Sequence, residues 1–292
     1  MIMDGRPILF LDSGVGGIPY CRHFHQHNSG EGIIYLADRA NFPYGKRSRE
    51  DLIHILRSLI EKLIPPFDPK IIVVACNTAT VSTISALRAF FPDLPFVGTV
   101  PAVKPAVTES KKGRVAVLGT ARTIEDPYIA ELAAQYGPHC TLHGIAAPEL
   151  VDFIEYRYAG ADEGEKRKVV LSYLEKFRAA GVDAVVLGCT HFLFLLDEFR
   201  REAAPDIKIY DSVEGISRRI ESLLDKDDSR LRGGNGLWRA AGSAGAGASP
   251  SADRANRFLV TGGTPTGGTP ESSWKFWADY LGFSLSSFGD QI

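Results

Sequence analysis

The sequence predicts an α/β protein built from two halves of similar pattern, each with a mostly parallel central sheet. Two stretches carry this prediction, because in each an apolar, β-branched run stops at a cysteine that polar side chains follow. Such runs are typical of strands buried on both faces of a parallel sheet. The two stretches are residues 71–80, which contain Cys76, and residues 182–191, which contain Cys189.

Composition narrows the class of protein. The chain has 292 residues and a formal net charge of −2, and no basic run is dense enough to indicate a nucleic-acid partner. Its four scattered cysteines form no Cys-x-x-Cys pair, which argues against a zinc site or a disulfide framework. No apolar run is long enough to cross a bilayer, and residues 1–17 do not read as a signal peptide. We therefore expect a cytoplasmic enzyme that does not bind a membrane.

The first half opens with a buried strand over residues 6–11, which runs into the turn Asp12-Ser13-Gly14-Val15-Gly16-Gly17. Asp12 and Ser13 fall at the carboxyl end of this strand, where open α/β sheets bind ligands, and they also suit an N-cap. A helix follows the capping-box-like pair Ser48 and Asp51, and the prolines at 65 and 66 are expected to end it. The other expected elements are strands over 33–37, 71–75 and 95–100, a structured loop over 38–46 and a helix over 81–88.

The pattern then restarts after a proline-rich boundary at residues 101–105. A strand over 114–118 meets Gly119-Thr120-Ala121-Arg122-Thr123 as the first strand meets its glycine turn. Helices are expected over 124–136, 166–180 and 192–201, and strands over 141–145 and 182–187. Because each half has an opening strand and turn and a later strand, cysteine and helix, the pattern suggests an ancient duplication.

The last part of the chain is expected to return to the first domain. A strand over 207–212 and a helix over 213–224 precede a Gly-, Ala-, Ser- and Arg-rich stretch, which we expect to form a flexible insertion at about 227–254. A strand over 257–261 and an aromatic-rich helix containing Trp274 and Trp277 complete it. The expected domains are residues 1–101 with 210–292, and residues 102–209.

Two cysteines facing each other suit the inversion of a carbon acid, which needs a base on one face and an acid on the other. An unperturbed thiol has a pKa of about 8.5, so a modestly perturbed pair can hold one thiolate and one thiol near neutral pH. His191 lies two residues after Cys189, and Asp12 is expected at the same edge of its sheet as Cys76. Each is expected to assist proton transfer by the thiol beside it. A substrate carboxylate would be held by the polar side chains of Ser13, Asn77, Thr78 and Thr190, and Asp12 could meet the ammonium group.

Five motifs in this order closely resemble the glutamate racemases of the aspartate/glutamate racemase superfamily. They are Asp12-Ser13-Gly14-Val15-Gly16-Gly17, Pro43-Tyr44-Gly45, Cys76-Asn77-Thr78-Ala79-Thr80, Leu118-Gly119-Thr120 and Gly188-Cys189-Thr190-His191. The resemblance covers nearly the whole chain outside the expected insertion. It implies two pseudo-symmetric α/β domains with the active site in the cleft between them, racemisation of glutamate without a cofactor or metal, and a possible homodimer. It also implies a supply of D-glutamate for bacterial peptidoglycan, and so for cell-wall biogenesis and cell shape.

The resemblance also assigns roles to individual residues. It makes Cys76 the residue that deprotonates D-glutamate and Cys189 the residue that deprotonates L-glutamate, with Asp12, His191 and Glu155 in support. The positions that it implies for lining or binding substrate are Asp12, Ser13, Tyr44, Gly45, Asn77, Thr78, Thr120, Thr123, Thr190 and His191.

Three alternatives remain open at this point. An aspartate racemase is the nearest, although His191 and the stretch Thr78-Ala79-Thr80 favour glutamate. A cysteine hydrolase would use one nucleophilic thiol, Cys189, with His191 as its base, but it leaves Cys76 unexplained. A non-catalytic ligand-binding protein predicts that both cysteines can be replaced by serine without loss of function.

Overall fold

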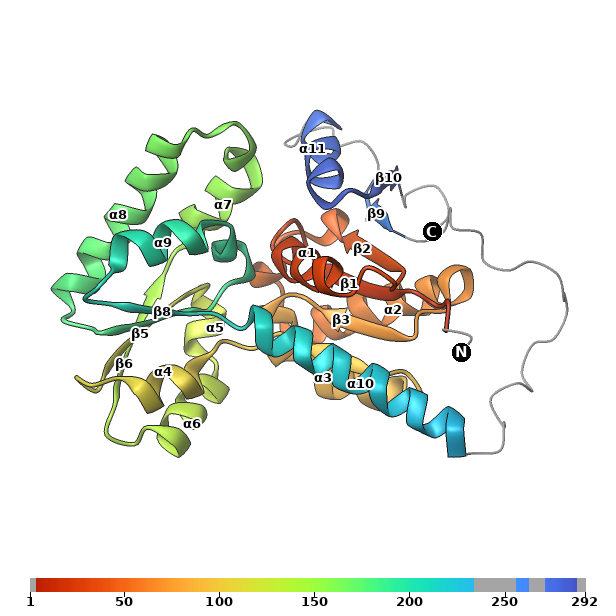
Figure 1. Cartoon of the computed structure of the whole chain (residues 1–292), viewed down its shortest axis with the longest axis horizontal. Coiled ribbons are helices and arrows are strands. Elements are labelled where there is room, and N and C mark those ends of the chain that lie inside the picture. The colour runs from red at the N-terminus through yellow and green to blue at the C-terminus, as the bar shows by residue number, and fades with distance from the viewer. Residues whose placement is uncertain (1–3, 234–255, 263–270, 288–292) are drawn as a thin grey trace, which may run out of the picture.

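The computed structural model describes residues 4–233, 256–262 and 271–287, and in these residues the chain forms two lobes, each built on one sheet (Figure 1). The six-stranded sheet has the order β10-β9-β2-β1-β3-β4, and every neighbouring pair is parallel. It combines strands from both ends of the described chain. Its strands are β1 (Ile8–Asp12), β2 (Ile33–Ala37), β3 (Ile71–Val74), β4 (Phe96–Gly98), β9 (Arg257–Val260) and β10 (Ser284–Ser287).

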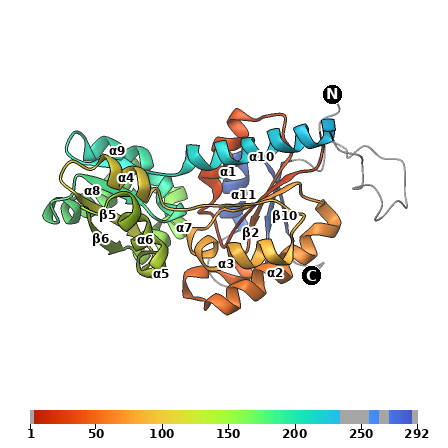
Figure 2. The ribbon, with the colours of Figure 1, turned by 90° about the horizontal axis from the view of Figure 1, so that it is seen from below.

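Helices cover both faces of this sheet (Figure 2). Alternate residues of β1 point to opposite faces, so Ile8 and Phe10 pack on one side and Leu9 and Leu11 on the other. The first side is covered by α1 (Ile18–His27), α10 (Val213–Gly233) and α11 (Glu271–Leu281), and the second by α2 (Arg49–Phe67) and α3 (Asn77–Phe90). Burial of both faces explains why these strands read as continuous apolar runs.

The four-stranded sheet comes from the middle of the chain and has the order β6-β5-β7-β8, again all parallel. This order matches β2-β1-β3-β4 of the larger sheet, which is the arrangement a duplication would leave. Its strands are β5 (Arg114–Gly119), β6 (Thr141–Ala146), β7 (Ala184–Leu187) and β8 (Lys208–Tyr210). Its helices are α4 (Val103–Glu109), α5 (Ala121–Glu125), α6 (Pro127–Tyr136), α7 (Pro148–Tyr156), α8 (Glu163–Ala179) and α9 (Leu196–Ala203).

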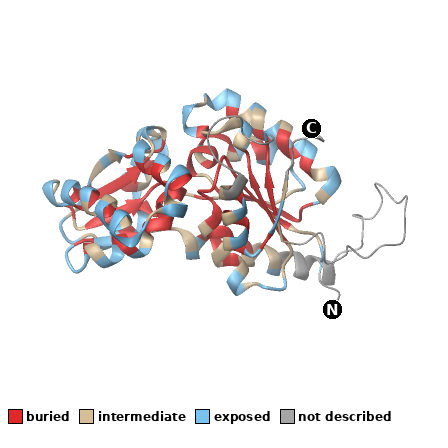
Figure 3. Cartoon of the chain, turned by 90° about the horizontal axis from the view of Figure 1, so that it is seen from above, coloured by how far each residue is buried: buried red, intermediate tan, exposed pale blue. Residues whose placement is uncertain are grey.

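Burial follows the sheets, whose strands are mostly buried while the outer faces of the helices are exposed (Figure 3). One apolar cluster runs through both lobes, since it includes Phe10 of β1 and Leu118 of β5. A shared apolar core, on the face of the larger sheet to which Phe10 points, therefore joins the two lobes. The predicted domain limits, 1–101 with 210–292 and 102–209, stay a prediction.

Proline explains two differences from the expected helices. The helix expected over 124–136 is broken, because Pro127 begins α6 and holds the preceding Asp126 in an extended conformation, with φ −68° and ψ 126°. In contrast, Pro65 and Pro66 do not end α2 but lie in its last turn. The helix ends instead at Asp68, whose left-handed backbone lets its N–H bond to the carbonyl of Ile64.

Three further segments differ from expectation. The second cysteine is followed by a 3₁₀ segment, η4 (Thr190–Leu195), before α9 begins, and strand β10 was not predicted at all. Strand β8 pairs with β7, so the chain crosses back to the larger lobe only after this strand. Helix α10 continues to Gly233, so the start of the expected insertion is helical, and its remainder, 234–254, lies outside the described residues. Among the helices that the structure describes, none is long and apolar enough to span a membrane.

Candidate active site

The predicted site residues gather where the carboxyl ends of the two sheets face each other. Asp12 ends β1, Cys76 follows β3, Thr120 follows β5 and Cys189 follows β7. The two cysteine motifs are in direct contact, because the side-chain amide of Asn77 donates to the carbonyl of Gly188 at 2.8 Å. This bond joins residues 111 positions apart in the chain and places the polar turns of both halves together.

The two cysteines occupy equivalent positions. Each is the N-cap residue of the helix that follows its strand, and both have extended backbones, with φ/ψ of −135°/121° at Cys76 and −129°/135° at Cys189. Cys76 keeps some accessible surface, whereas Cys189 is buried. Burial of its sulfur raises the pKa of the Cys76 thiol well above its ordinary value, and the charge of Asp12 adds to this. The backbone N–H groups at the start of α3 oppose the shift only in part.

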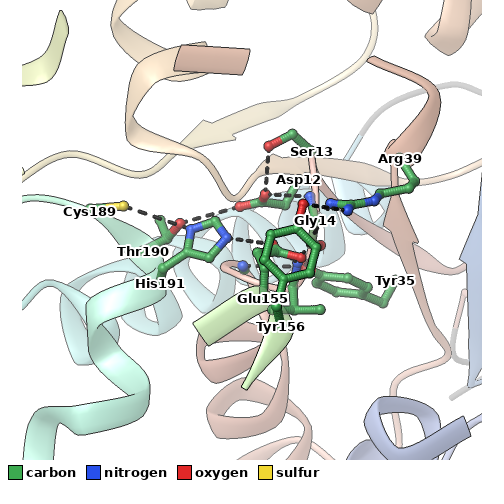
Figure 4. A network of polar contacts seen from close by, with 12 residues as sticks. Asp12, Ser13, Gly14, Tyr35, Arg39, Glu155, Tyr156, Cys189, Thr190 and His191 are labelled. Carbon is green, nitrogen blue, oxygen red and sulfur yellow. Dashed lines mark hydrogen bonds and ion pairs between the residues drawn. The ribbon is translucent and has the colours of Figure 1, made fainter. Parts of the chain in front are cut away.

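Cys189 belongs to a chain of buried polar contacts that ends on α7 (Figure 4). Its sulfur lies 3.7 Å from Nδ1 of His191, and Nε2 of His191 lies 2.6 Å from Oε1 of Glu155. Burial alone lowers the pKa of His191, but the hydrogen bonds with Cys189 and Glu155 outweigh it and hold the pKa well above 6.5. The raised pKa favours the protonated, cationic form of the imidazole.

Asp12 stands between the two halves of the site. Its Oδ1 accepts from the N–H of Gly14 at 2.9 Å and from the hydroxyl of Ser13 at 3.3 Å. Its Oδ2 accepts from the hydroxyl of Thr190 at 3.3 Å. Burial raises the pKa of Asp12, although the charge of His191 and the N–H of Gly14 act in the opposite direction.

The glycine turn after β1 is packed against the polar groups of the other half. The N–H of Val15 donates to Oε1 of Glu155 at 3.0 Å. A Cβ atom at Gly14 would lie 2.0 Å from the same oxygen, and one at Gly16 would lie 2.4 Å from Nδ1 of His191. Glycine is required at both positions because the carboxylate and the imidazole approach the backbone so closely.

Three threonines form a second polar group that also spans the two halves. Thr78, at the start of α3, has its hydroxyl 3.3 Å from those of both Thr120 and Thr123, which are 3.0 Å apart. The hydroxyl of Thr120 also caps α5 by accepting from the N–H of Thr123. Gly45 lies beside this group, since a Cβ atom there would be 3.9 Å from Cγ2 of Thr120.

Tyr44 and Asn77 complete the predicted set. Tyr44 is buried, and its hydroxyl donates to Oδ2 of Asp38 at 2.8 Å, so it is held by the loop after β2. Asn77 is buried as well, and its Oδ1 has no hydrogen-bond donor among the described residues. This oxygen is a ready acceptor for a donor group on a bound molecule. The structure therefore brings the predicted residues into one region, and their individual roles stay predictions.

Tyr35 and Arg39 are members of the network that were not in the predicted set. The hydroxyl of Tyr35 donates to the carbonyl of Gly14 at 2.8 Å and accepts from the N–H of Gly17 at 3.2 Å, which fixes the glycine turn. Its signal in the sequence was a tyrosine in an otherwise aliphatic strand, because a buried phenol needs a partner. Arg39 contacts Glu155 and was marked only by its place in a loop at the ligand edge of the sheet.

Other features of the described chain are separate from this region. Within residues 4–233, 256–262 and 271–287, no group of three or more His, Cys, Asp or Glu side chains is arranged to hold a metal ion. A hollow of about 850 Å³ between the lobes contains none of the predicted site residues and is lined by side chains such as Arg22, Lys104 and Tyr280. The candidate site is therefore defined by its polar contacts and not by this hollow.

Comparison with known proteins identifies similar sequences over most of the chain. A family model described as Asp/Glu/hydantoin racemase matches residues 20–218, which include both cysteines and His191. The glutamate racemase of Sphingopyxis alaskensis is 38% identical over 221 residues, which are 75% of this chain and 82% of that protein. The glutamate racemase of Treponema pallidum is 38% identical over 224 residues, 77% and 83% of the two chains.

A solved structure is similar over the whole fold. The crystal structure of Escherichia coli glutamate racemase, in complex with L-glutamate and the activator UDP-MurNAc-ala, has a TM-score of 0.76 and 28% sequence identity to this chain. The similarity covers 97% of this chain and 98% of that chain. Both lobes and the polar contacts between them therefore lie within the region of similarity.

Proposed function

The chain belongs to the Asp/Glu/hydantoin racemase family, and we propose that it interconverts L-glutamate and D-glutamate by a two-base mechanism that uses Cys76 and Cys189. Its class is an amino-acid racemase, and glutamate as substrate is supported by the relatives that are 38% identical and by the structural neighbour with a TM-score of 0.76.

The equivalent placement of the two cysteines is the observation that carries the proposal. Each cysteine is the N-cap residue of the helix that follows a strand at the same position of its sheet, and Asn77 links the two turns directly. Inversion at a carbon needs proton transfer on opposite faces, so it needs two such groups. A hydrolase would need only Cys189 and His191, and it would leave the equivalent placement of Cys76 without a purpose.

From L-glutamate, the Cys189 thiolate takes the proton from Cα and becomes a thiol. The electron pair that stays on Cα then takes the proton of the Cys76 thiol from the opposite face, and Cys76 becomes the thiolate. The product is D-glutamate, and the reverse reaction exchanges the two roles. Each step moves one proton, and the single negative charge passes from the Cys189 sulfur to Cα and then to the Cys76 sulfur, so the scheme needs no redox partner and no cofactor.

The raised pKa of the Cys76 thiol is consistent with a reaction that starts from L-glutamate. The raised pKa of Cys76 favours a thiol there, and the scheme pairs it with a thiolate at Cys189, whose sulfur lies 3.7 Å from Nδ1 of His191. This pairing is the one required to begin with L-glutamate. The enzyme must exchange the proton between the two sides before it can begin with D-glutamate.

Polar groups around the thiols suit the ends of an amino acid. The Thr78, Thr120 and Thr123 hydroxyls offer several donors for a carboxylate, and each of them comes from the start of a helix, where backbone N–H groups point outward. Asn77 Oδ1 and the carboxylate of Asp12 offer acceptors for the ammonium group. Stronger binding of the carbanion than of the substrate by these donors would lower the barrier. The D-glutamate so formed would supply peptidoglycan synthesis.

Chiral chromatography of L-glutamate incubated with the purified protein tests the activity. We expect Cys76→Ser and Cys189→Ser each to reduce the rate by about 10²–10⁴-fold or more, because a positioned acid/base is replaced by a poorly ionised hydroxyl. Cys140→Ser is the matched control, because this free thiol lies away from the site and bonds to the carbonyl of Val107. In D₂O, deuterium should enter mainly the newly formed enantiomer at early times.

Each alternative predicts a different result. Equal deuterium in unreacted substrate and product would contradict the two-base scheme. A covalent acyl-enzyme trapped on Cys189 would favour a hydrolase. Full racemase activity in either serine variant would remove that cysteine from the mechanism.

A further inference from the structure

Arg39 reaches from one lobe to the catalytic side of the other. It begins the short helix η1 (Arg39–Asn41) after β2, and its guanidinium lies beside α7 of the smaller lobe (Figure 4). Nη1 is 3.5 Å from Oε2 of Glu155, and Nη2 donates to the hydroxyl of Tyr156 at 2.8 Å. The guanidinium carbon also lies 4.2 Å from the centre of the Phe42 ring, so the side chain is held from three directions.

The contact places the carboxylate of Glu155 between two cationic groups. Oε1 bonds to His191 at 2.6 Å, and Oε2 faces Arg39 at 3.5 Å. The side chain of Glu155 has no accessible surface, and that of Arg39 is only 13% exposed. Charges interact strongly when solvent screens them so little, so the arginine acts on the carboxylate and, through it, on the imidazole.

We propose that Arg39 is a positioning residue for racemisation. It fixes the Glu155 carboxylate from the side opposite His191 and weakens the electrostatic attraction between that carboxylate and the protonated imidazole. Proton exchange between His191 and Cys189 then remains possible during turnover. This role rests on the proposed function, because it assumes that Cys189 exchanges a proton in each cycle.

The direction of the effect follows from the charges around the imidazole. The imidazole of His191 contacts Glu155 of α7 and Cys189 of its own turn, and its charge acts on Asp12 of β1. Arg39 of η1 lies on the far side of the Glu155 carboxylate, and the buried Tyr35 hydroxyl of β2 lies near Asp12 and Glu155. Among these described residues, Arg39 is the one cation whose charge does not depend on pH near neutrality. Its removal leaves the anionic partners unopposed, and the imidazole should then hold its proton to higher pH.

The test follows the titration of His191 by NMR of protein labelled at histidine Cε1, in a Cys189→Ser background. This background removes the sulfur whose hydrogen bond also raises the pKa of His191, so the midpoint is expected at a more accessible pH, and the readout does not depend on racemase activity. We expect Arg39→Gln to move the midpoint up by about 0.5 to 1 pH unit, the order expected for loss of one partly screened charge.

Two variants separate charge from packing. Arg39→Lys keeps the charge but cannot bond to both Glu155 and Tyr156, and its midpoint should stay within about 0.3 pH unit of the parent. Tyr156→Phe removes only the hydroxyl partner of Arg39, and its midpoint should not move. Arg39→Met, which keeps the packing on the rings, replaces Arg39→Gln if that variant does not fold.

The outcomes distinguish this inference from the proposed function. An unchanged midpoint in Arg39→Gln, or an equal shift in Arg39→Lys or Tyr156→Phe, would overturn the role of Arg39 even if the protein racemises glutamate. The expected shift in a protein that does not racemise glutamate would support the electrostatic link and refute the proposed function. In the enzyme with Cys189 intact, the alkaline change in the pH profile of kcat/KM should move in the same direction.

Discussion

Gly14 is the position where the smallest added side chain is expected to disrupt the site. A Cβ atom there would lie 2.0 Å from Oε1 of Glu155 and 2.9 Å from its Cδ, closer than any real contact. The backbone of Gly14 is not in the left-handed region, so alanine is excluded by this contact alone. In Gly14→Ala the carboxylate must move, and its bonds to the N–H of Val15 and to His191 are expected to break.

The magnitude follows from these two bonds. A hydrogen bond to a charged group contributes about 1.5–3 kcal/mol, so two of them contribute about 3–6 kcal/mol before the structure relaxes. The displaced carboxylate can keep its contact with Arg39, so we expect about 3 kcal/mol of lost stability. For a chain of this size that lowers Tm by about 6–9 °C. Loss of the orienting group on His191 should also reduce kcat by about 100-fold.

Thermal unfolding followed by circular dichroism and chiral chromatography of the product measure the two effects. Gly215→Ala is the matched control, because no atom lies within 4 Å of its added Cβ and the residue is in the first turns of α10. That change should leave activity unaltered and Tm unchanged or slightly raised. Wild-type stability and activity in Gly14→Ala would refute the reasoning.

A double variant tests the cause. Adding Glu155→Asp to Gly14→Ala shortens the carboxylate and makes room for the new methyl group. If the clash is the cause, the double variant should lose less stability than the sum of the two single changes. Simple additivity would show that Gly14 acts for another reason.

Two further predictions concern pH and substrate. The pKa of His191 is raised above 6.5 in the folded protein, despite burial, so its stabilising contribution is complete below pH 6.5 and is lost as pH rises through the folded pKa. Urea unfolding should show this decline, and Glu155→Gln, which removes one of the bonds that raise the pKa, should show a smaller one; equal declines would contradict the assignment. We also expect kcat/KM for glutamate to exceed that for aspartate by at least about a hundredfold, because a missing methylene is worth about 1–3 kcal/mol and a misplaced charged hydrogen bond adds to it. Comparable racemisation of L-aspartate would reject glutamate as the preferred substrate and leave the two-cysteine mechanism standing.

The sequence by itself determined the parallel sheets and the two cysteine turns. Both depend on local information, because a strand buried on two faces must be apolar throughout, and a turn at its end needs polar caps and glycine. The stretches before Cys76 and Cys189 therefore identified β3 and β7 correctly. The resemblance of the motifs also led to the family that the comparisons support.

Local sequence patterns predicted the secondary structure less reliably where a proline or a neighbouring strand determined it. Pro127 divided an expected helix in two, because it could start α6 but not continue α5. Strand β10 has the sequence Ser-Leu-Ser-Ser, which has little strand character of its own. It forms because the edge of β9 offers unpaired backbone groups, and only the assembled sheet supplies that edge.

Only the tertiary structure decided which residues of the site contact one another. Glu155 meets Val15 across 140 residues and His191 across 36, and Asn77 meets Gly188 across 111. No periodicity along the chain encodes such contacts, because they arise when two separately folded turns pack against each other. The sequence could therefore place the two thiols at strand ends, while the charged side chains that surround them, with Arg39 beside Glu155, became visible only when the two lobes met.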